Sequence, residues 1–370
     1  MENAQKQLER LTRPFWLQNT MYDECAVMIR RADGSITAKL LFPPVRIIEV
    51  RDCLLQTVYR EGTDYIWDGE HHILLRPEGS SIPYFTPNDL AGIDENGEQI
   101  RAWGDTAKGW TKESPWDGLG RSRFQNALYC IGAFLYEKQF AVTYEYAAGA
   151  WQGPVTPYQG ERLPHTLQKL TSEKHLHLCF YGDSIFTGCD ASAMYDRPPY
   201  QESFPELVKA VLSDTYGAEI CLSNPSVAGM DSVWGAAHAE ELVAALHPDL
   251  VYLGFGMNDI ERPGNETAAN IQSIMDTIRR RNPACEFVVV VPMVPNAAGG
   301  FLQRQKELSA AYAALTGEGT ALADMFAVHT EILKWKDFSA TSGNNINHPN
   351  DWLIRVYAMQ LLSVLVRFQS

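Results

Sequence analysis

The chain is short of basic side chains. Its 370 residues include 31 lysines and arginines against 45 aspartates and glutamates, which gives a formal net charge of −14. A field of this sign repels the phosphate backbone of nucleic acids and the surface of anionic membranes. We therefore expect neither a nucleic-acid partner nor a membrane partner.

Long apolar runs are also missing. The longest apolar stretches, such as 287–294, are too short to cross a bilayer. Residues 1–5 show no basic segment followed by an apolar core, which a secretory signal peptide would need. From these two absences we expect a cytoplasmic protein.

Clustered cysteines are a third absence. The seven cysteines are scattered, and none forms a C-x-x-C pair or lies beside paired histidines: Cys25, Cys53, Cys130, Cys179, Cys189, Cys221 and Cys285. This pattern indicates neither a disulfide framework nor a structural zinc site. We expect no metal and no cofactor, and the oligomeric state stays open.

What is present is the composition of a folded globular protein, with 45% hydrophobic and 21% charged residues. In the first half, short β-branched and aromatic runs at 45–50, 72–75 and 140–144 alternate with turn-forming pairs. Those pairs are Asp33-Gly34, Asp68-Gly69 and Asn96-Gly97. The pattern predicts a β-rich domain over residues 1–165, which we interpret as a β-sandwich of jelly-roll type.

The second half has a different pattern of apolar residues. A proline- and glycine-rich connection at 151–160 precedes it. Beyond it, short apolar runs alternate with helix-length segments, at 176–181, 220–222, 250–253 and 287–291. This alternation is typical of a parallel α/β sheet. We predict an α/β domain over residues 166–370.

Two helices can be placed from their apolar spacing. The stripe that starts at Phe204 predicts a helix over 204–212, with Ser203 and Glu206 as a capping box. The segment Asp351–Phe368 is apolar on several faces, so we expect a well-buried final helix.

A serine follows the first apolar run of the α/β half. In an open parallel sheet, reactive groups collect beyond the carboxyl ends of the strands. Ser184, in Gly182-Asp183-Ser184, is therefore the candidate nucleophile. The alternative is a turn and helix cap, because all three residue types favour such positions.

Two further strand ends carry candidate oxyanion donors. Gly229 follows the run at 220–222 and can present an unobstructed backbone N–H, while Asn258 follows the run at 250–253 and can offer its side-chain amide. Turn formation and helix capping are again the alternative explanation.

His348 is the best-placed base among nine histidines, immediately before the final apolar helix. A serine hydroxyl needs a base to accept its proton, and imidazole titrates in the right range. A surface loop histidine is the alternative. His175 and His177 flank the first strand and are interpreted as edge or surface residues rather than metal ligands.

Taken together, these blocks resemble the SGNH (GDSL-type) hydrolase superfamily. The match runs from Gly182-Asp183-Ser184-Ile185 through Gly229 and 256–259 to His348. The resemblance implies a flavodoxin-like α/β/α sandwich with a five-stranded parallel sheet, and an acyl-enzyme on Ser184. It also implies that His348 is the general base, and that the backbone N–H groups of Ser184 and Gly229 and the amide of Asn258 form the oxyanion hole.

One alternative fold is disfavoured by the same motif. The position two residues after Ser184 lacks the second glycine of G-x-S-x-G, which argues against an α/β-hydrolase.

One position departs from the family pattern. The family commonly has an aspartate three residues before the histidine, where this chain has Asn345. An amide cannot stabilise an imidazolium as a carboxylate does. We therefore favour a Ser184–His348 dyad, with a backbone carbonyl fixing the tautomer. Three carboxylates remain as candidate replacements: Asp337, Glu331 and Asp351. Asp351 is explained equally well as a helix N-terminal residue.

The first half holds six of the nine tryptophans, among them a group with acidic neighbours: Trp103, Trp110 and Trp116, with Asp105 and Asp117. Flat aromatic faces suit sugar rings, although such clusters more often form the core of a small β domain. In the second half, four further residues are candidates for the pocket lining: Asp190, Tyr195, Asp231 and Trp234.

The leading hypothesis is an esterase that removes short acyl groups, O-acetyl in particular, from a carbohydrate. A second hypothesis keeps the enzyme and changes its substrate to a lipid, thioester or aryl ester. A third is a saccharide-binding protein with a decayed esterase fold, to which Asn345 gives some weight.

Overall fold

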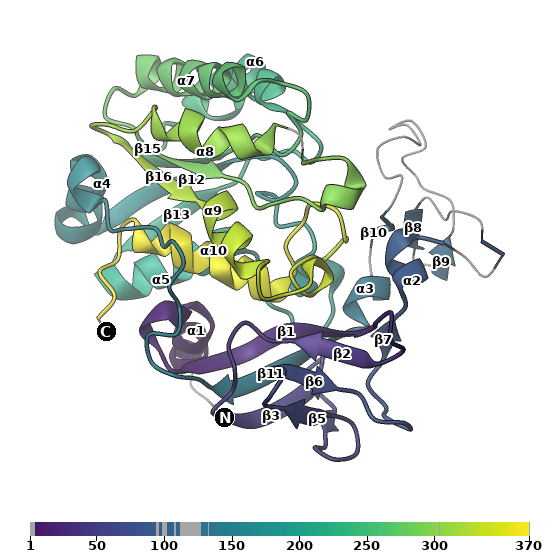
Figure 1. Ribbon diagram of the computed structural model, residues 1–370. Helices are drawn as coiled ribbons and strands as arrows, with labels where there is room; N and C mark the ends of the chain where they lie inside the picture. The colour runs from purple at the N-terminus through teal and green to yellow at the C-terminus, as the bar shows by residue number, and fades with distance from the viewer. Residues whose placement is uncertain are drawn as a thin grey trace.

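The computed structural model describes residues 4–93, 96–97, 102–106, 109–111, 127–131, 133–302 and 304–369. For 102–106, 109–111, 131 and 133 it describes the backbone only. Figure 1 shows the two larger sheets, one mainly antiparallel and formed early in the chain, the other parallel and formed late.

The antiparallel sheet is built around the long strand β1 (Thr20–Arg30). Its order is β4-β3-β11-β1-β2-β6-β5, and β7 also pairs with β1, in parallel. Residues 20–27 of β1 pair with β11, whereas residues 29–30 pair with β2, so β1 belongs to both halves of the sheet. The other strands are β2 (Ile36–Lys39), β3 (Arg46–Asp52), β4 (Val58–Tyr59), β5 (Ile66–Asp68), β6 (Ile73–Leu75), β7 (Tyr84–Phe85) and β11 (Gln139–Glu145).

Smaller elements accompany this sheet. Three short strands form a separate sheet in the order β10-β8-β9: β8 (Ala102–Thr106), β9 (Gly109–Thr111) and β10 (Tyr129–Ile131). Of the short helices in this half, α3 (Ala133–Tyr136) contacts this sheet and α2 (Pro87–Ala91) contacts β7, whereas α1 (Ala4–Thr12) packs on α5 (Phe204–Tyr216) and α10 (Asp351–Ser363). Of the predicted aromatic group, Trp103, Asp105 and Trp110 lie on β8 and β9, where only the backbone is described, and Trp116 and Asp117 lie outside the described residues. Whether they form a core or a sugar contact stays a prediction.

The parallel sheet has five strands in the order β13-β12-β14-β15-β16, and every neighbouring pair is parallel. The strands are β12 (His175–Gly182), β13 (Glu219–Ser223), β14 (Leu250–Gly254), β15 (Glu286–Val291) and β16 (Thr320–Asp324). The central strand β14 is buried throughout because helices cover both faces of the sheet. This confirms the predicted flavodoxin-like α/β/α fold, preceded by an antiparallel β part.

Helices cover the two faces of the parallel sheet (Figure 1). On one face lie α6 (Ser232–Leu242), α7 (Gly264–Arg281) and α8 (Gln305–Ala313). On the other lie α5 (Phe204–Tyr216), α9 (Met325–Ile332) and α10 (Asp351–Ser363). The short helix α4 (Pro164–Gln168) leads into β12. None of the helices among the described residues has the length and apolar character needed to span a bilayer.

The two helices predicted in detail differ from expectation at their ends. In α5, the predicted apolar stripe is buried, but the Ser203 side chain makes no capping hydrogen bond, so the capping box is wrong. Glu206 instead approaches Lys209 at 3.5 Å. The final helix α10 ends at Ser363 rather than at 368, and just beyond its end the Val364 carbonyl accepts a hydrogen bond from the Gln159 N–H at 2.9 Å.

The two sheets are joined through α10 and the segment before α4. Arg355 of α10 donates to the backbone carbonyls of Tyr22 and Asp23 at 2.9 Å and 2.6 Å. In the connecting segment, the Thr156 N–H donates to the Gln360 side chain at 2.6 Å. The change from antiparallel to parallel strands falls between 145 and 175, and a boundary at 165/166 stays a prediction.

Candidate active site

Strand register brings three of the predicted site loops to one edge of the parallel sheet. Gly182 of β12 is paired with Gly254 of β14, and Cys179 is paired with Ser223 of β13. In parallel strands the carboxyl ends meet at the same edge, so the loops after β12, β13 and β14 are neighbours there. These loops carry Ser184, Gly229 and Asn258 respectively.

The turn at Ser184 depends on the absence of side chains at the ends of two strands. A Cβ atom on Gly254 would lie 1.9 Å from the Phe186 ring, and one on Gly182 would lie 2.7 Å from it. The Phe186 ring therefore packs directly over both strand ends, and the chain turns sharply between Gly182 and Phe186. Asp183 stabilises this turn by accepting the Ile185 N–H at 2.9 Å, and burial raises the pKa of its carboxyl to about 7.

Ser184 and His348 are in contact. The Ser184 hydroxyl lies 2.8 Å from Nε2 of His348, and the serine is only 6% exposed. The Asn344 side chain shapes the histidine loop by accepting the backbone N–H groups of residues 346, 347 and 348 at 2.9–3.0 Å. The Ser342 hydroxyl donates to the His348 carbonyl at 2.9 Å, so the imidazole extends from a loop fixed on both sides.

A carboxylate does face the other imidazole nitrogen, and it is Asp190. Its Oδ2 lies 2.6 Å from Nδ1 of His348, and its Oδ1 accepts a hydrogen bond from the Tyr195 hydroxyl at 2.6 Å. Asp190 is 8% exposed and has a φ of +68°, in the left-handed region. The side chains thus form a continuous serine–histidine–aspartate hydrogen-bonded chain rather than the dyad expected from the sequence.

The three carboxylates proposed as replacements lie elsewhere. Asp337 forms an ion pair with Arg31 at 2.7 Å, and Glu331 pairs with Lys334 at 2.6 Å. Asp351 accepts the Ser192 N–H at 2.9 Å. All three candidates lie close to His348 in the sequence, whereas the carboxylate that contacts it comes from the loop that also carries Ser184.

Asn345, at the position of the family's aspartate, has a structural contact instead. Its φ is +64°, and its side-chain amide donates to the Leu90 and Leu128 carbonyls, both at 3.1 Å. The Cys130 N–H donates to the neighbouring Asn344 carbonyl at 3.0 Å. The histidine loop is therefore attached to the N-terminal part of the chain.

The predicted oxyanion donors are available. Within the described part of the chain, neither the Ser184 nor the Gly229 backbone N–H has a hydrogen-bond partner. Gly229 has a φ of +80°, a conformation that glycine adopts readily. One N–H of the Asn258 amide donates to the Met230 carbonyl at 3.0 Å, which ties this side chain to the Gly229 loop. An amide nitrogen has a second N–H, which remains for a ligand.

The remaining pocket candidates divide into two pairs. Asp190 and Tyr195 belong to the hydrogen-bonded chain. Asp231 instead caps α6 by accepting the Trp234 N–H at 2.9 Å, and Trp234 stacks on His238 with ring centroids 4.4 Å apart. Only one feature of the sequence could have predicted Asp190 as the partner of His348: it is an acidic residue in the same loop as Ser184.

The two histidines at the first strand are not site residues. His175 is exposed, and His177 contacts the Ser223 hydroxyl at 2.9 Å. The part of the chain that the structure describes contains no group of three or more His, Cys, Asp or Glu side chains placed to hold a metal ion.

Comparison with known families identifies the α/β half. Residues 180–352 match the GDSL-like Lipase/Acylhydrolase family, a range that contains Ser184, Asp190 and His348. The α/β half is therefore similar to this family over the matched range. The match agrees with the resemblance to SGNH (GDSL-type) hydrolases in the sequence, and we call the matched range the GDSL-like domain. A comparison with curated proteins finds no match for the chain.

Solved structures with a similar fold include several esterases. A two-domain esterase (CEX) active on acetylated mannans, co-crystallised with mannopentaose, is 17% identical with a TM-score of 0.44, over 56% of this chain and 53% of that one. The chain therefore matches about half the length of that protein. The acetylxylan esterase Axe2 from Geobacillus stearothermophilus is 19% identical with a TM-score of 0.42, over 52% of this chain and 94% of that one. The lipase Lip_vut3 from a goat rumen metagenome is 13% identical with a TM-score of 0.39, over 50% and 95%.

Proposed function

We propose that the GDSL-like domain hydrolyses short acyl esters, O-acetyl groups on a carbohydrate in the first place, through an acyl-enzyme on Ser184. The observation that carries the proposal is the unbroken chain from the Ser184 hydroxyl through His348 to Asp190, with contacts of 2.8 Å and 2.6 Å. Such a chain supplies the base that a serine hydroxyl needs to become a nucleophile.

In the first half of the reaction, the Ser184 oxygen attacks the ester carbonyl while Nε2 of His348 takes the hydroxyl proton. The imidazolium that forms donates through Nδ1 to Asp190, whose negative charge stabilises it. Charge develops on the former carbonyl oxygen, where the N–H groups of Ser184, Gly229 and Asn258 donate hydrogen bonds. His348 then gives the proton to the leaving alcohol as its bond to the acyl carbon breaks.

The second half returns the enzyme to its starting state. Water attacks the acyl-serine carbonyl and passes a proton to Nε2 of His348. The same three N–H groups stabilise the second oxyanion. The carboxylic acid leaves when the bond to the Ser184 oxygen breaks, and that oxygen recovers its proton from His348.

A polar alcohol is the proposed leaving group because of charge and loop chemistry. A net charge of −14 disfavours work at an anionic lipid surface. The loop after β13 carries hydrogen-bonding side chains near the nucleophile's strand: Asn224 donates to the Phe186 carbonyl at 2.7 Å, and the Ser226 hydroxyl donates to the Phe180 carbonyl at 3.3 Å. These bonds hold a polar loop beside the nucleophile's strand, and a polar surface suits a sugar better than an acyl chain.

A catalytically decayed saccharide-binding protein is the less favoured alternative. Its main support was the missing aspartate at position 345, and Asp190 supplies a carboxylate in its place. Hydrolysis of a lipid, thioester or aryl ester uses the same machinery and differs only in substrate.

The test is turnover of p-nitrophenyl esters of increasing chain length, together with acetate release from acetylated xylo- and manno-oligosaccharides. We expect preference for acetate, loss of turnover in Ser184→Ala, and mass addition of a serine-directed phosphonate at Ser184. Ser213→Ala, at a hydroxyl that donates to the Ala218 carbonyl and has no contact with His348, is the matched control and keeps its activity. Preference for long acyl chains would favour the lipid alternative, and unchanged turnover in Ser184→Ala would remove the nucleophile assignment.

A further inference from the structure

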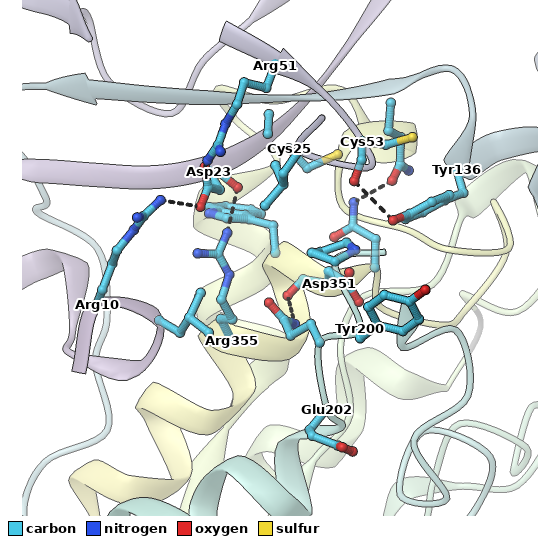
Figure 2. Close-up of a pocket in the computed structure, with 18 of the residues that line it drawn as sticks. Arg10, Asp23, Cys25, Arg51, Cys53, Tyr136, Tyr200, Glu202, Asp351 and Arg355 are labelled. Carbon is cyan, nitrogen blue, oxygen red and sulfur yellow. Dashed lines mark hydrogen bonds and ion pairs between the residues drawn. The ribbon is translucent and has the colours of Figure 1, made fainter. Parts of the chain in front are cut away.

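A cavity of about 370 Å³ lies where the antiparallel sheet meets α10 (Figure 2). Its walls come from α1, the strands β1, β3 and β11, the segment at 199–202 and the start of α10. The volume falls within the range of small-molecule sites, about 300–1,000 Å³. None of Ser184, Asp190 and His348 lines it, although it adjoins a smaller pocket that Asp190 lines.

Two residues that line the cavity each have a buried polar atom with no hydrogen-bond partner in the part of the chain that the structure describes: Oδ2 of Asp351 and Nε of Arg355. These residues are four apart on α10, a spacing at which Asp and Arg ordinarily pair. Here each side chain turns to another partner. Oδ1 of Asp351 accepts the Ser192 N–H, and the terminal nitrogens of Arg355 donate to carbonyls of β1.

The cost of this arrangement points to a ligand. Leaving a buried donor or acceptor unpaired costs about 1–3 kcal/mol for each group, and more for charged ones. A ligand hydroxyl group can donate its hydrogen to a carboxylate oxygen and can accept from a guanidinium on its own oxygen, so it satisfies both kinds of group.

Charged side chains of both signs surround the cavity, so a ligand of either charge would be repelled by some of them. An anion would face the carboxylates of Asp351 and Glu202. A cation would face three guanidinium groups, those of Arg10, Arg51 and Arg355. Asp23 is already occupied, because it accepts from Arg10 at 2.7 Å and from Arg51 at 2.8 Å. A neutral ligand with hydroxyl groups meets neither repulsion.

Aromatic side chains complete the wall. Tyr136, Tyr200 and Trp352 line the cavity, and Tyr200 is 56% exposed. Figure 2 shows Tyr136 and Tyr200 near one another on the side opposite Arg10. Flat apolar faces beside paired donors and acceptors suit the C–H and O–H groups of a sugar ring.

We propose that this cavity is a second binding site, for a small neutral polyol such as a monosaccharide or one sugar unit of an oligosaccharide. The proposal does not rest on the proposed reaction, because no residue of the serine–histidine–aspartate chain takes part. It does reach the active site indirectly. Asp351 holds the Ser192 N–H, two residues beyond Asp190, and lies three residues beyond His348.

Binding can be measured on the full chain by saturation-transfer NMR and isothermal titration calorimetry with xylose, mannose and glucose. Glucuronate and glucosamine serve as the charged comparison. We expect at least one neutral sugar to bind, both charged sugars to bind more weakly, and Ser184→Ala to bind the neutral sugar as the wild type does. Loss of binding in Ser184→Ala would place the sugar in the active site and overturn the proposal.

Two variants locate the bound sugar. Ala141 lines the cavity from β11, so Ala141→Phe fills the space without removing a polar group. Asp351→Asn keeps an oxygen for the Ser192 N–H but turns an N–H toward the donor of Arg355, and we expect at least about tenfold weaker binding. Asp337→Asn, a carboxylate change outside the cavity, is the matched control.

Folding of each variant is checked by its thermal unfolding and by its turnover of p-nitrophenyl acetate. The proposal holds if Ala141→Phe and Asp351→Asn fold and lose sugar affinity while Asp337→Asn retains it. It is overturned if none of the three neutral sugars binds the wild type. It is also overturned if the folded Ala141→Phe variant binds as the wild type does.

Discussion

Asp190 and His348 lie 158 residues apart in the chain, and their side chains meet at 2.6 Å. The carboxylate comes from the loop after β12 that also carries Ser184, while the imidazole comes from the loop before α10. One loop therefore holds both ends of the hydrogen-bonded chain, and the histidine side chain lies between them. Any shift of the histidine loop changes both contacts at once.

Replacing Asp190 tests that relationship. We expect Asp190→Asn to lower kcat by roughly 10³–10⁴-fold, because an amide can stabilise the wrong imidazole tautomer and cannot stabilise the imidazolium. Asp196→Asn, an exposed aspartate in the same loop, is the control and should keep its kcat. Steady-state kinetics on p-nitrophenyl acetate measure both, and a wild-type kcat in Asp190→Asn would show that the contact is not used.

Asn345 offers the reverse experiment. Asn345→Asp restores the family's residue type, but its carboxylate would face the Leu90 and Leu128 carbonyls, which now accept hydrogen bonds. We expect a loss of about 1–3 kcal/mol in the free energy of unfolding and no gain in kcat. Urea unfolding and turnover measure the two effects. A variant with higher kcat and unchanged stability would mean that position 345 has access to the imidazole.

The oxyanion role of Asn258 predicts a specific kinetic signature. We expect Asn258→Ala to lower kcat by roughly 10²–10³-fold with little change in KM, because the lost hydrogen bond forms mainly in the transition state. Asn270 donates to the Ser232 hydroxyl at 2.8 Å and is a partly buried asparagine for comparison. Equal kinetic losses in Asn258→Ala and Asn270→Ala would assign the effect to folding instead.

His329 predicts how stability depends on pH. It is fully buried, it accepts the Val294 N–H at 3.1 Å, and burial lowers its pKa from 6.5 to about 3. Between these values the unfolded chain binds a proton that the folded protein does not, so stability falls as the pH falls. The slope is about 1.4 kcal/mol per pH unit, which amounts to about 2 kcal/mol between pH 6.5 and 5.

The measurement is urea unfolding of the wild type and His329→Gln at pH 7.5 and pH 5. The variant should lose less stability on acidification, even if it is less stable at both pH values. Burial raises the pKa of Asp183 to about 7 and that of Asp351 to about 6, and these carboxyls act in the opposite direction in both proteins. The difference between the two proteins therefore isolates His329, and parallel pH curves would contradict the prediction.

Lys336 and Glu24 form an ion pair with both side chains 0% exposed. The pair connects β1 to the segment after α9, and Glu24 also accepts the Leu41 N–H at 2.8 Å. Lys336→Met leaves the Glu24 charge buried without its partner, so we expect a loss of about 3–5 kcal/mol in the free energy of unfolding. Adding Glu24→Gln should restore a large part of it, and additive losses in the double variant would show that the charges are not coupled.

The sequence by itself determined the parallel sheet and the positions of the serine and the histidine. Apolar runs that alternate with helical stripes can bury their surfaces only as strands between two helix layers, so the α/β/α order follows from hydrophobic periodicity. The Gly-Asp-Ser turn and the His348 loop were visible because their residue types suit turns at strand and helix ends. The local sequence was enough to predict these features because each of them depends on residues that are neighbours in the chain.

Only the tertiary structure decided which carboxylate faces His348 and what Asn345 contacts. Both contacts depend on distances between loops that are far apart in the sequence. From the sequence alone, several acidic residues were equally good candidates for the partner of His348. The same holds for the cavity beside α10, where Asp351 and Arg355 have the spacing of an ion pair and turn to other partners instead. Packing between the two sheets determines which side chains come into contact. Hydrophobic periodicity describes only which face of an element is buried, so it cannot predict these contacts.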